Sequence, residues 1–148
     1  MGSYQRVLVG TDGSASSFRA VDRAAAIARD AGAQLLIVTA YKPASQREQL
    51  EAADQLKDAA YKVAGSAPAE DVLRDAVGRV GGDGLDIDTV AVQGEPVDAL
   101  IKLAEERQVD LIVVGNRGMG SLTGRLLGSV PSVAAHRSPC DILIVATT

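Results

Sequence analysis

The chain has 148 residues, 47% of them hydrophobic, which fits one domain with one good core. Its formal charge of −4 and its aromatic content of 3% argue against a nucleic-acid-binding surface, because such surfaces are basic and stack bases on aromatic rings. No apolar run approaches the roughly 20 residues that span a bilayer, no secretory signal is visible, and the single cysteine cannot form an internal disulfide. These features predict a cytoplasmic protein with a single domain over residues 1–148.

The first third of the chain predicts a strand, a helix and a second strand. An apolar run from Arg6 to Gly10 has the length of a buried strand. Ser14 is a candidate N-cap of the following helix, and Gly32 is a candidate C-cap. Residues 34–40, with the sequence QLLIVTA, form a second buried strand. This order makes a βαβ unit, whose crossover is right-handed.

The middle of the chain is less regular. Good helix formers occupy residues 46–63, the sequence GSAP at 65–68 interrupts them, and a second helix is expected over 69–80. This crossover therefore contains a broken pair of helices, or is partly mobile, or lies over a ligand site. Residues 85–92 alternate in hydrophobicity, which predicts an edge strand with one face less buried than the other.

The last third of the chain predicts two further strands. A helix opens at Glu95 and Pro96, an acid and a proline that suit a first turn. A buried strand is expected over 110–114, a helix ends near residue 137, and a final strand covers 141–146. Five strands alternating with helices predict an α/β fold: an open five-stranded parallel sheet, in the order 3-2-1-4-5, with helices on both faces.

A glycine-rich segment from Gly115 to Val130 follows the fourth strand and reads GNRGMGSLTGRLLGSV. Glycines let a ligand approach the backbone closely, and a helix N-terminus offers unpaired N–H groups and a partial positive charge. This junction of strand, loop and helix therefore suits a phosphate. Arg117 and Arg125 are candidate charged donors, and Ser129 is a candidate hydroxyl donor.

The spacing of this segment, G-x2-G-x9-G-S, lacks the Gly-Lys of a P-loop and lies too late in the chain for a Rossmann fingerprint. It resembles the ATP-binding signature of the universal stress protein family. The resemblance extends to the Asp-Gly-Ser turn that closes residues 7–14, to Gly94, Glu95 and Pro96, and to the final strand, so it covers nearly the whole chain. It implies the Rossmann-like fold of the adenine nucleotide alpha hydrolase-like proteins, with the same strand order.

Two turns converge in this fold. In the order 3-2-1-4-5, strands 2 and 3 lie on one side of strand 1, and strands 4 and 5 lie on the other side. Ligands bind beyond the carboxyl ends of the strands at the switch point between strands 1 and 4. We expect Asp12, in the turn after strand 1, to accept hydrogen bonds from ribose hydroxyls or an adenine amino group, or to hold Mg²⁺. The competing interpretation is an Asx-turn or a helix cap. The resemblance also places the backbone around Val38 to Ala40 against the adenine. The predicted nucleotide-binding residues are Gly10, Thr11, Asp12, Val38, Ala40, Gly115, Arg117, Gly118, Gly128, Ser129 and Val130.

No other residue predicts catalysis or a metal site made by protein alone. His136 lies late in a helix, where the dipole favours a cation, and Cys140 is expected to be a small buried residue. Tyr61 and Lys62 are further candidates to face the pocket. One histidine, one cysteine and no close cluster of acids make no zinc-type set, so any Mg²⁺ comes with the phosphates.

The sequence therefore predicts an adenine-nucleotide-binding stress or signalling module, which binds ATP or cyclic AMP and reports its occupancy to an unknown protein partner. One alternative is a slow ATPase or nucleotidyl transferase, although no general base and no lysine lie in the glycine-rich segment. A second alternative is a structural dimer without nucleotide. The resemblance implies a homodimer paired through the final strands, and exposed sheet edges seek partners.

Overall fold

The computed structural model describes residues 4–42, 66–82, 84–116 and 137–147. The helix expected over 46–63 and most of the helix expected to end near residue 137 lie outside these ranges. The elements in chain order are β1 (Arg6–Gly10), α1 (Ala15–Ala31), β2 (Gln34–Tyr41), α4 (Ser66–Val80), β3 (Ile87–Gln93), α5 (Pro96–Glu106), β4 (Leu111–Gly115) and β5 (Asp141–Val145).

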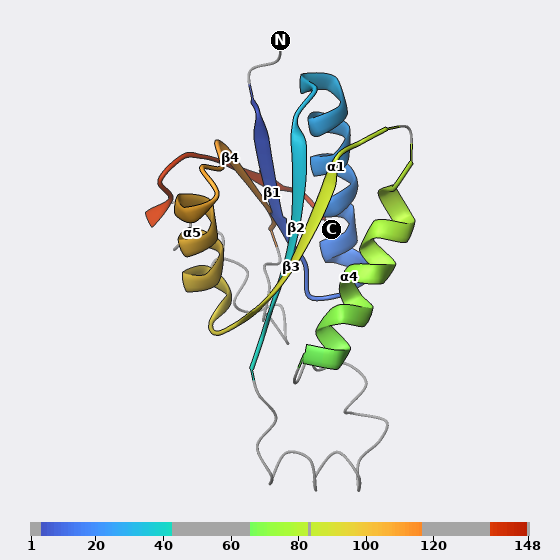
Figure 1. Cartoon of the computed structure of the whole chain (residues 1–148), viewed down its shortest axis with the longest axis vertical. Coiled ribbons are helices and arrows are strands. Elements are labelled where there is room, and N and C mark those ends of the chain that lie inside the picture. The colour runs from blue at the N-terminus through green and yellow to red at the C-terminus, as the bar shows by residue number, and fades with distance from the viewer. Residues whose placement is uncertain (1–3, 43–65, 83, 117–136, 148) are drawn as a thin grey trace, which may run out of the picture.

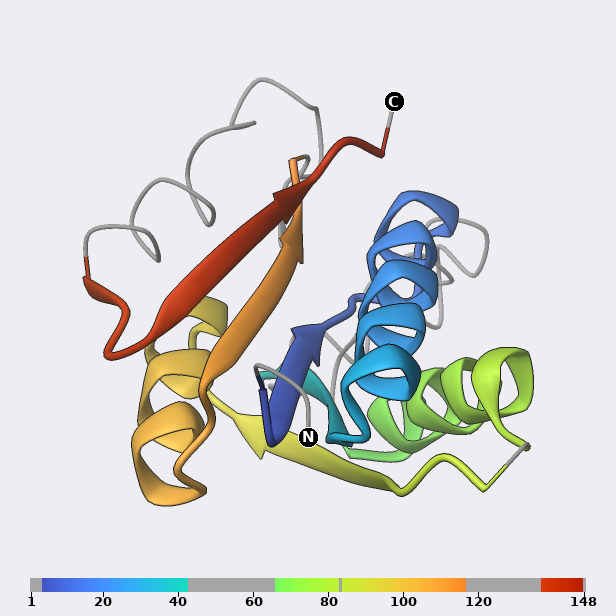
Figure 2. The same cartoon turned by 90° about the horizontal axis from the view of Figure 1, so that it is seen from above.

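The five strands form one parallel sheet in the order β3-β2-β1-β4-β5, which confirms the predicted topology. Helices α1 and α4 cover one face of the sheet and α5 covers the other (Figures 1 and 2). All the strands run in one direction, so their carboxyl ends gather at the same end of the molecule (Figure 1). The switch point between β1 and β4 lies at that end.

The sheet is buried on both faces, which explains why its central strands are continuous apolar runs rather than alternating ones. In β1, Val7 and Val9 face α1 and α4, whereas Leu8 faces α5. All three side chains are fully buried. On the α1 side the helix contributes small residues, mostly alanines, so its backbone lies close to the strands.

The edge strand β3 differs from its prediction. It begins at Ile87 rather than at residue 85, and its burial does not alternate. Ile87 and Ala91 pack on the α4 side, and Val90 and Val92 pack on the α5 side, all of them half-buried. The edge position is confirmed, but the expected difference between the two faces is wrong, because apolar clusters cover both of them.

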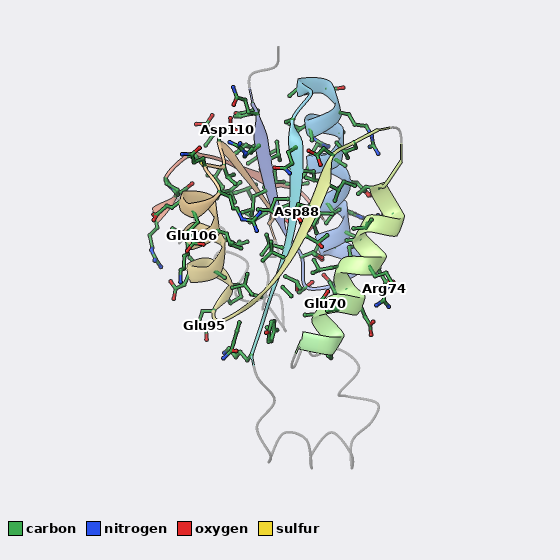
Figure 3. The ribbon with its side chains drawn as sticks, in the orientation of Figure 1. Glu70, Arg74, Asp88, Glu95, Glu106 and Asp110 are labelled. Atoms are coloured by element: carbon green, nitrogen blue, oxygen red, sulfur yellow. The ribbon has the colours of Figure 1, made fainter. Side chains whose placement is uncertain are left out.

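The ends of the first helix are those predicted. The hydroxyl of Ser14 accepts a hydrogen bond from the Ser17 N–H at 3.1 Å, and Gly32 ends the helix with a left-handed φ of 66°. Asp110 lies at the amino ends of the strands (Figure 3). Its carboxylate accepts hydrogen bonds from the N–H groups of Gln5 and Arg6, at 2.8 and 3.0 Å.

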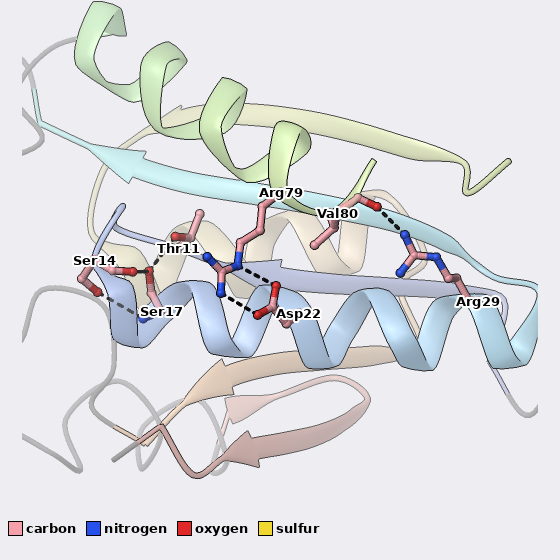
Figure 4. A network of polar contacts seen from close by, with 7 residues as sticks. All are labelled: Thr11, Ser14, Ser17, Asp22, Arg29, Arg79 and Val80. Atoms are coloured by element: carbon pink, nitrogen blue, oxygen red, sulfur yellow. Dashed lines mark hydrogen bonds and ion pairs between the residues drawn. The ribbon is translucent and has the colours of Figure 1, made fainter. Parts of the chain in front are cut away.

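Helix α4 is attached to α1 by charged groups as well as by apolar contacts (Figure 4). The guanidinium of Arg79 donates to both carboxylate oxygens of Asp22, at 2.7 and 2.8 Å, and lies 5.7 Å from the centre of the Phe18 ring. Arg29 donates to the carbonyl of Val80 at the end of α4. These contacts join the last turn of α4 to α1, on the same face of the sheet.

Candidate functional site

Strands β1 and β4 separate at their carboxyl ends. The last paired residues between them are Val9 and Val113, whereas β1 stays paired with β2 as far as Gly10. Thr11 and Gly115 each lie two residues beyond the last β1–β4 pair, so the two turns predicted to converge start at the same level in neighbouring strands. In open parallel sheets ligands bind beyond the carboxyl ends of the strands at such a switch point.

The side chain of Thr11 faces inward. It is fully buried, and its hydroxyl lies 2.7 Å from the Ser17 hydroxyl and accepts a hydrogen bond from the Gly13 N–H at 3.1 Å (Figure 4). Thr11 can therefore offer only main-chain groups to a ligand, and one of these, its N–H, already donates to the carbonyl of Val38. The role of this residue is to hold the turn.

Asp12 forms the Asx-turn that was the competing interpretation of this residue. Its Oδ1 accepts a hydrogen bond from the Ser14 N–H at 2.9 Å. This bond uses one carboxylate oxygen, and Oδ2 has no hydrogen-bond partner within the described ranges. The Asx-turn and a ligand role are thus compatible, because the first orients the carboxylate that the second would need.

The turn is packed tightly against α4. Gly13 has a φ of 85°, and a Cβ at this position would lie 2.9 Å from Cγ2 of Val72. Glycine is therefore required here for both its backbone conformation and the close approach of the helix. As a result α4 supports the turn from behind, and the position of Asp12 depends on it.

The adjacent edge of β2 carries unpaired main-chain groups. In a parallel strand alternate residues direct their N–H and C=O to opposite neighbours. Tyr41 bonds toward β3, and Val38 bonds toward β1. Ala40 therefore directs its N–H and C=O toward β1, which has already turned away after Thr11. Among the described residues Ala40 has no hydrogen-bond partner on that side.

The end of β4 is held by residues that follow β5. A Cβ on Gly115 would lie 3.0 Å from Cγ2 of Thr147 and 3.9 Å from Cβ of Ala20, so this glycine makes room for protein atoms on the α1 face. The next residue, Asn116, accepts hydrogen bonds at Oδ1 from the Thr147 N–H at 3.0 Å and the Thr147 hydroxyl at 2.8 Å. Sequence reasoning missed Asn116 and Thr147, because no local pattern links positions so far apart.

The remaining predicted residues lie mostly outside the described ranges. Those of the nucleotide site are Arg117, Gly118, Gly128, Ser129 and Val130, and the others are Arg125, His136, Tyr61 and Lys62. Cys140 is described and packs half-buried against the core on the α5 side. Burial raises the pKa of its thiol, against the opposing effect of a hydrogen bond with Ser138. Within the described ranges no three histidine, cysteine or acidic side chains gather as metal ligands.

Hollows lined by described residues lie at the amino ends of the strands, away from the switch point. One, of about 270 Å³, lies beside Arg6, Gln34 and Arg107, and another, of about 410 Å³, lies beside Tyr4, Ile27 and Asp141, among other residues. Neither includes a predicted nucleotide-binding residue. The candidate site therefore rests on the strand pairing and the main-chain groups at the carboxyl ends of β1, β2 and β4, and not on either hollow.

Comparison with known proteins gives a consistent result. The sequence model of the Universal stress protein family matches residues 3–146. A universal stress protein of Mycobacterium tuberculosis is 52% identical over 149 residues, with 100% of both chains covered. A crystal structure of a universal stress protein in complex with cAMP is similar with a TM-score of 0.74 and 46% identity, over 98% of each chain. The universal stress protein UspA from Lactobacillus plantarum is similar with a TM-score of 0.75 and 25% identity, over 98% of this chain and 99% of that one.

None of the described helices combines the length and the apolar character of a membrane-spanning helix.

Proposed function

The chain belongs to the universal stress protein family, and on that premise we propose that it binds an adenine nucleotide at the carboxyl ends of β1, β2 and β4. The observation that carries the proposal is the peptide edge of Ala40, which has no partner among the described residues and lies next to the point where β1 and β4 separate. A solved relative that is 46% identical was crystallised with cAMP, which supports the same ligand class here.

The chemistry of the Ala40 edge suits adenine in particular. A peptide C=O accepts one hydrogen bond and a peptide N–H donates one. The Watson–Crick edge of adenine has the complementary pair, an amino donor and a ring-nitrogen acceptor. Guanine presents an acceptor and a donor in the reverse order, so the same edge should discriminate against it. In this proposal Asp12 accepts from the ribose hydroxyls, and the phosphates lie toward the segment that follows Gly115 and Asn116.

We assign the chain a binding and reporting role, in which ATP or cyclic AMP occupies the site and a protein partner reads its occupancy. Any Mg²⁺ in this proposal arrives with the phosphates of ATP.

Isothermal titration tests the proposal with ATP, cyclic AMP and GTP as separate ligands. We expect binding of at least one adenine nucleotide, weaker binding of GTP, and a loss of affinity in Asp12→Ala. The matched control is Asp30→Ala, which removes an exposed carboxylate near the opposite end of α1. No heat with either adenine nucleotide, or equal affinity for GTP, would contradict the proposal.

We further propose that β5 pairs with β5 of a second copy. In the described sheet β5 is an edge strand, and Ile144 on it is a large hydrophobic side chain with 44% of its surface exposed. An apolar edge of this kind favours strand pairing between chains. Light scattering at micromolar concentration should give the mass of a dimer, and Ile144→Lys should shift the chain toward the monomer. A wild-type monomer under these conditions would exclude this arrangement.

A further inference from the structure

Thr147 is unusually well held for a residue beyond the last strand of a sheet. Only 3% of its surface is exposed. Its N–H and its hydroxyl both donate to Oδ1 of Asn116, at 3.0 and 2.8 Å, and its carbonyl accepts from Nη1 of Arg19 at 2.9 Å. Its methyl group packs against Gly115, where an added Cβ would lie 3.0 Å from it. Four different groups of one residue therefore contact the end of β4 and α1.

These contacts converge on the start of the glycine-rich segment. Gly115 is the last residue of β4 and Asn116 is the next residue along the chain. The Asn116 N–H also donates to the carbonyl of Val145 at 2.8 Å, so both its main chain and its side chain are attached to residues at or beyond the end of β5. Because a backbone N–H of Thr147 contacts the side chain of Asn116, the atom it meets must be the amide oxygen, which fixes the orientation of the side chain.

We propose that Thr147 is a positioning residue for the nucleotide site, acting through Gly115 and Asn116. The inference rests on the proposed nucleotide-binding function. Gly115 and Asn116 lie at the carboxyl end of β4, beside the proposed site, and main-chain groups that are held in place before a ligand arrives lose less conformational freedom on binding, so the affinity is higher. The same contacts join the ligand end of β4 to β5, which is the described edge of the sheet.

The decisive variant is Thr147→Val, which keeps the methyl packing against Gly115 and removes only the hydroxyl. We expect the Kd for the adenine nucleotide that the wild type binds, ATP or cyclic AMP, to rise about three- to tenfold, the change that one net hydrogen bond produces. Thr147→Ser retains the hydroxyl and should retain most of the affinity. Arg19→Gln, at an exposed side chain, removes the bond to the Thr147 carbonyl and should weaken binding in the same direction.

Tyr4→Phe is the matched control. It removes the hydroxyl that donates to Asp141 at 2.9 Å, which ties down the opposite end of the same strand. A residue that merely stabilised β5 would give the same loss of affinity in Tyr4→Phe as in Thr147→Val. Thermal unfolding of each variant without nucleotide establishes that the chain is folded at the titration temperature.

The outcomes separate the two proposals. Unchanged affinity in both Thr147→Val and Arg19→Gln overturns the positioning role alone, as does an equal loss in Tyr4→Phe. No binding of ATP or cyclic AMP by the wild type overturns the proposed function, and this inference with it. Weakened binding in Thr147→Val, with affinity retained in Thr147→Ser and Tyr4→Phe, supports the positioning role.

Discussion

Substitution of Gly13 by alanine tests whether α4 supports the turn beside the candidate site. Two separate costs are expected. A non-glycine residue in a left-handed conformation costs about 1–2 kcal/mol, and Gly13 has a φ of 85°. Overpacking a close contact costs about 1–3 kcal/mol, and the new Cβ would lie 2.9 Å from the Val72 side chain. The free energy of unfolding should therefore fall by about 2–5 kcal/mol, a large part of the stability of a domain of this size.

A matched control separates these two costs. Gly32 also has a left-handed φ, of 66°, but a Cβ there would meet no atom within 4 Å. Gly32→Ala should therefore show the backbone cost alone, about 1–2 kcal/mol. Val72→Ala in the Gly13→Ala background removes the methyl groups that clash, so the two substitutions should couple favourably by about 1–3 kcal/mol.

Urea unfolding of the single and double variants measures these differences as shifts of the midpoint. Equal losses in Gly13→Ala and Gly32→Ala, together with no coupling to Val72→Ala, would refute the reasoning that α4 is packed against this turn. Nucleotide titration of Gly13→Ala adds a functional readout, because a displaced turn moves Asp12.

Three further predictions concern side chains that make none of the proposed ligand contacts. Thr39→Val should raise the free energy of unfolding by about 1–3 kcal/mol, because the fully buried Thr39 hydroxyl has no hydrogen-bond partner within the described ranges. Thermal unfolding measures this gain. Asp22→Asn should cost only about 0.2–1 kcal/mol, because the ion pair with Arg79 is 45% exposed on both sides, and the difference should vanish in urea unfolding at high salt. The pKa of the Cys140 thiol in the folded protein lies above that of the unfolded thiol, which is about 8.5. The contribution of Cys140 to the free energy of unfolding should therefore be fully present below the unfolded pKa and be lost as the pH rises through the folded pKa. Cys140→Ala should remove this slope.

Buried strands were the easiest elements to predict. β1 matches its predicted bounds, β2 extends one residue beyond its predicted end, and β4 is shifted by one residue, because fully buried runs of apolar residues end where burial ends. Helix α4 was harder. It begins at Ser66, not at residue 69, because Pro68 lies in its first turn. A proline there loses no helical hydrogen bond, so it marks the start of a helix as readily as an interruption.

Only the location of the candidate site, at the switch point between β1 and β4, was predictable from the sequence. Strand order alone brings Thr11 and Gly115 to one level, and the order followed from the alternation of strands and helices and from the family resemblance. The inward orientation of Thr11 depends on a hydroxyl six residues away, and the contact between Asn116 and Thr147 joins positions 31 residues apart. Local patterns report the conformation of a segment, and they carry no information about which distant residue fills the space beside it.

In the described part of the site, side chains mostly hold the turns in place and main-chain groups are left for a ligand. Side chains at the ends of the strands are turned toward the protein: Thr11 toward Ser17, and Asn116 toward Thr147. The groups left for a ligand are those of the main chain at Ala40 and one carboxylate oxygen of Asp12. Peptide groups are the same in every residue, so recognition at Ala40 should survive most changes of its side chain. Binding at the site as a whole should instead be sensitive to substitutions at Gly13, which lies next to Asp12, and at Thr147, which packs against Gly115, although neither side chain need touch the nucleotide.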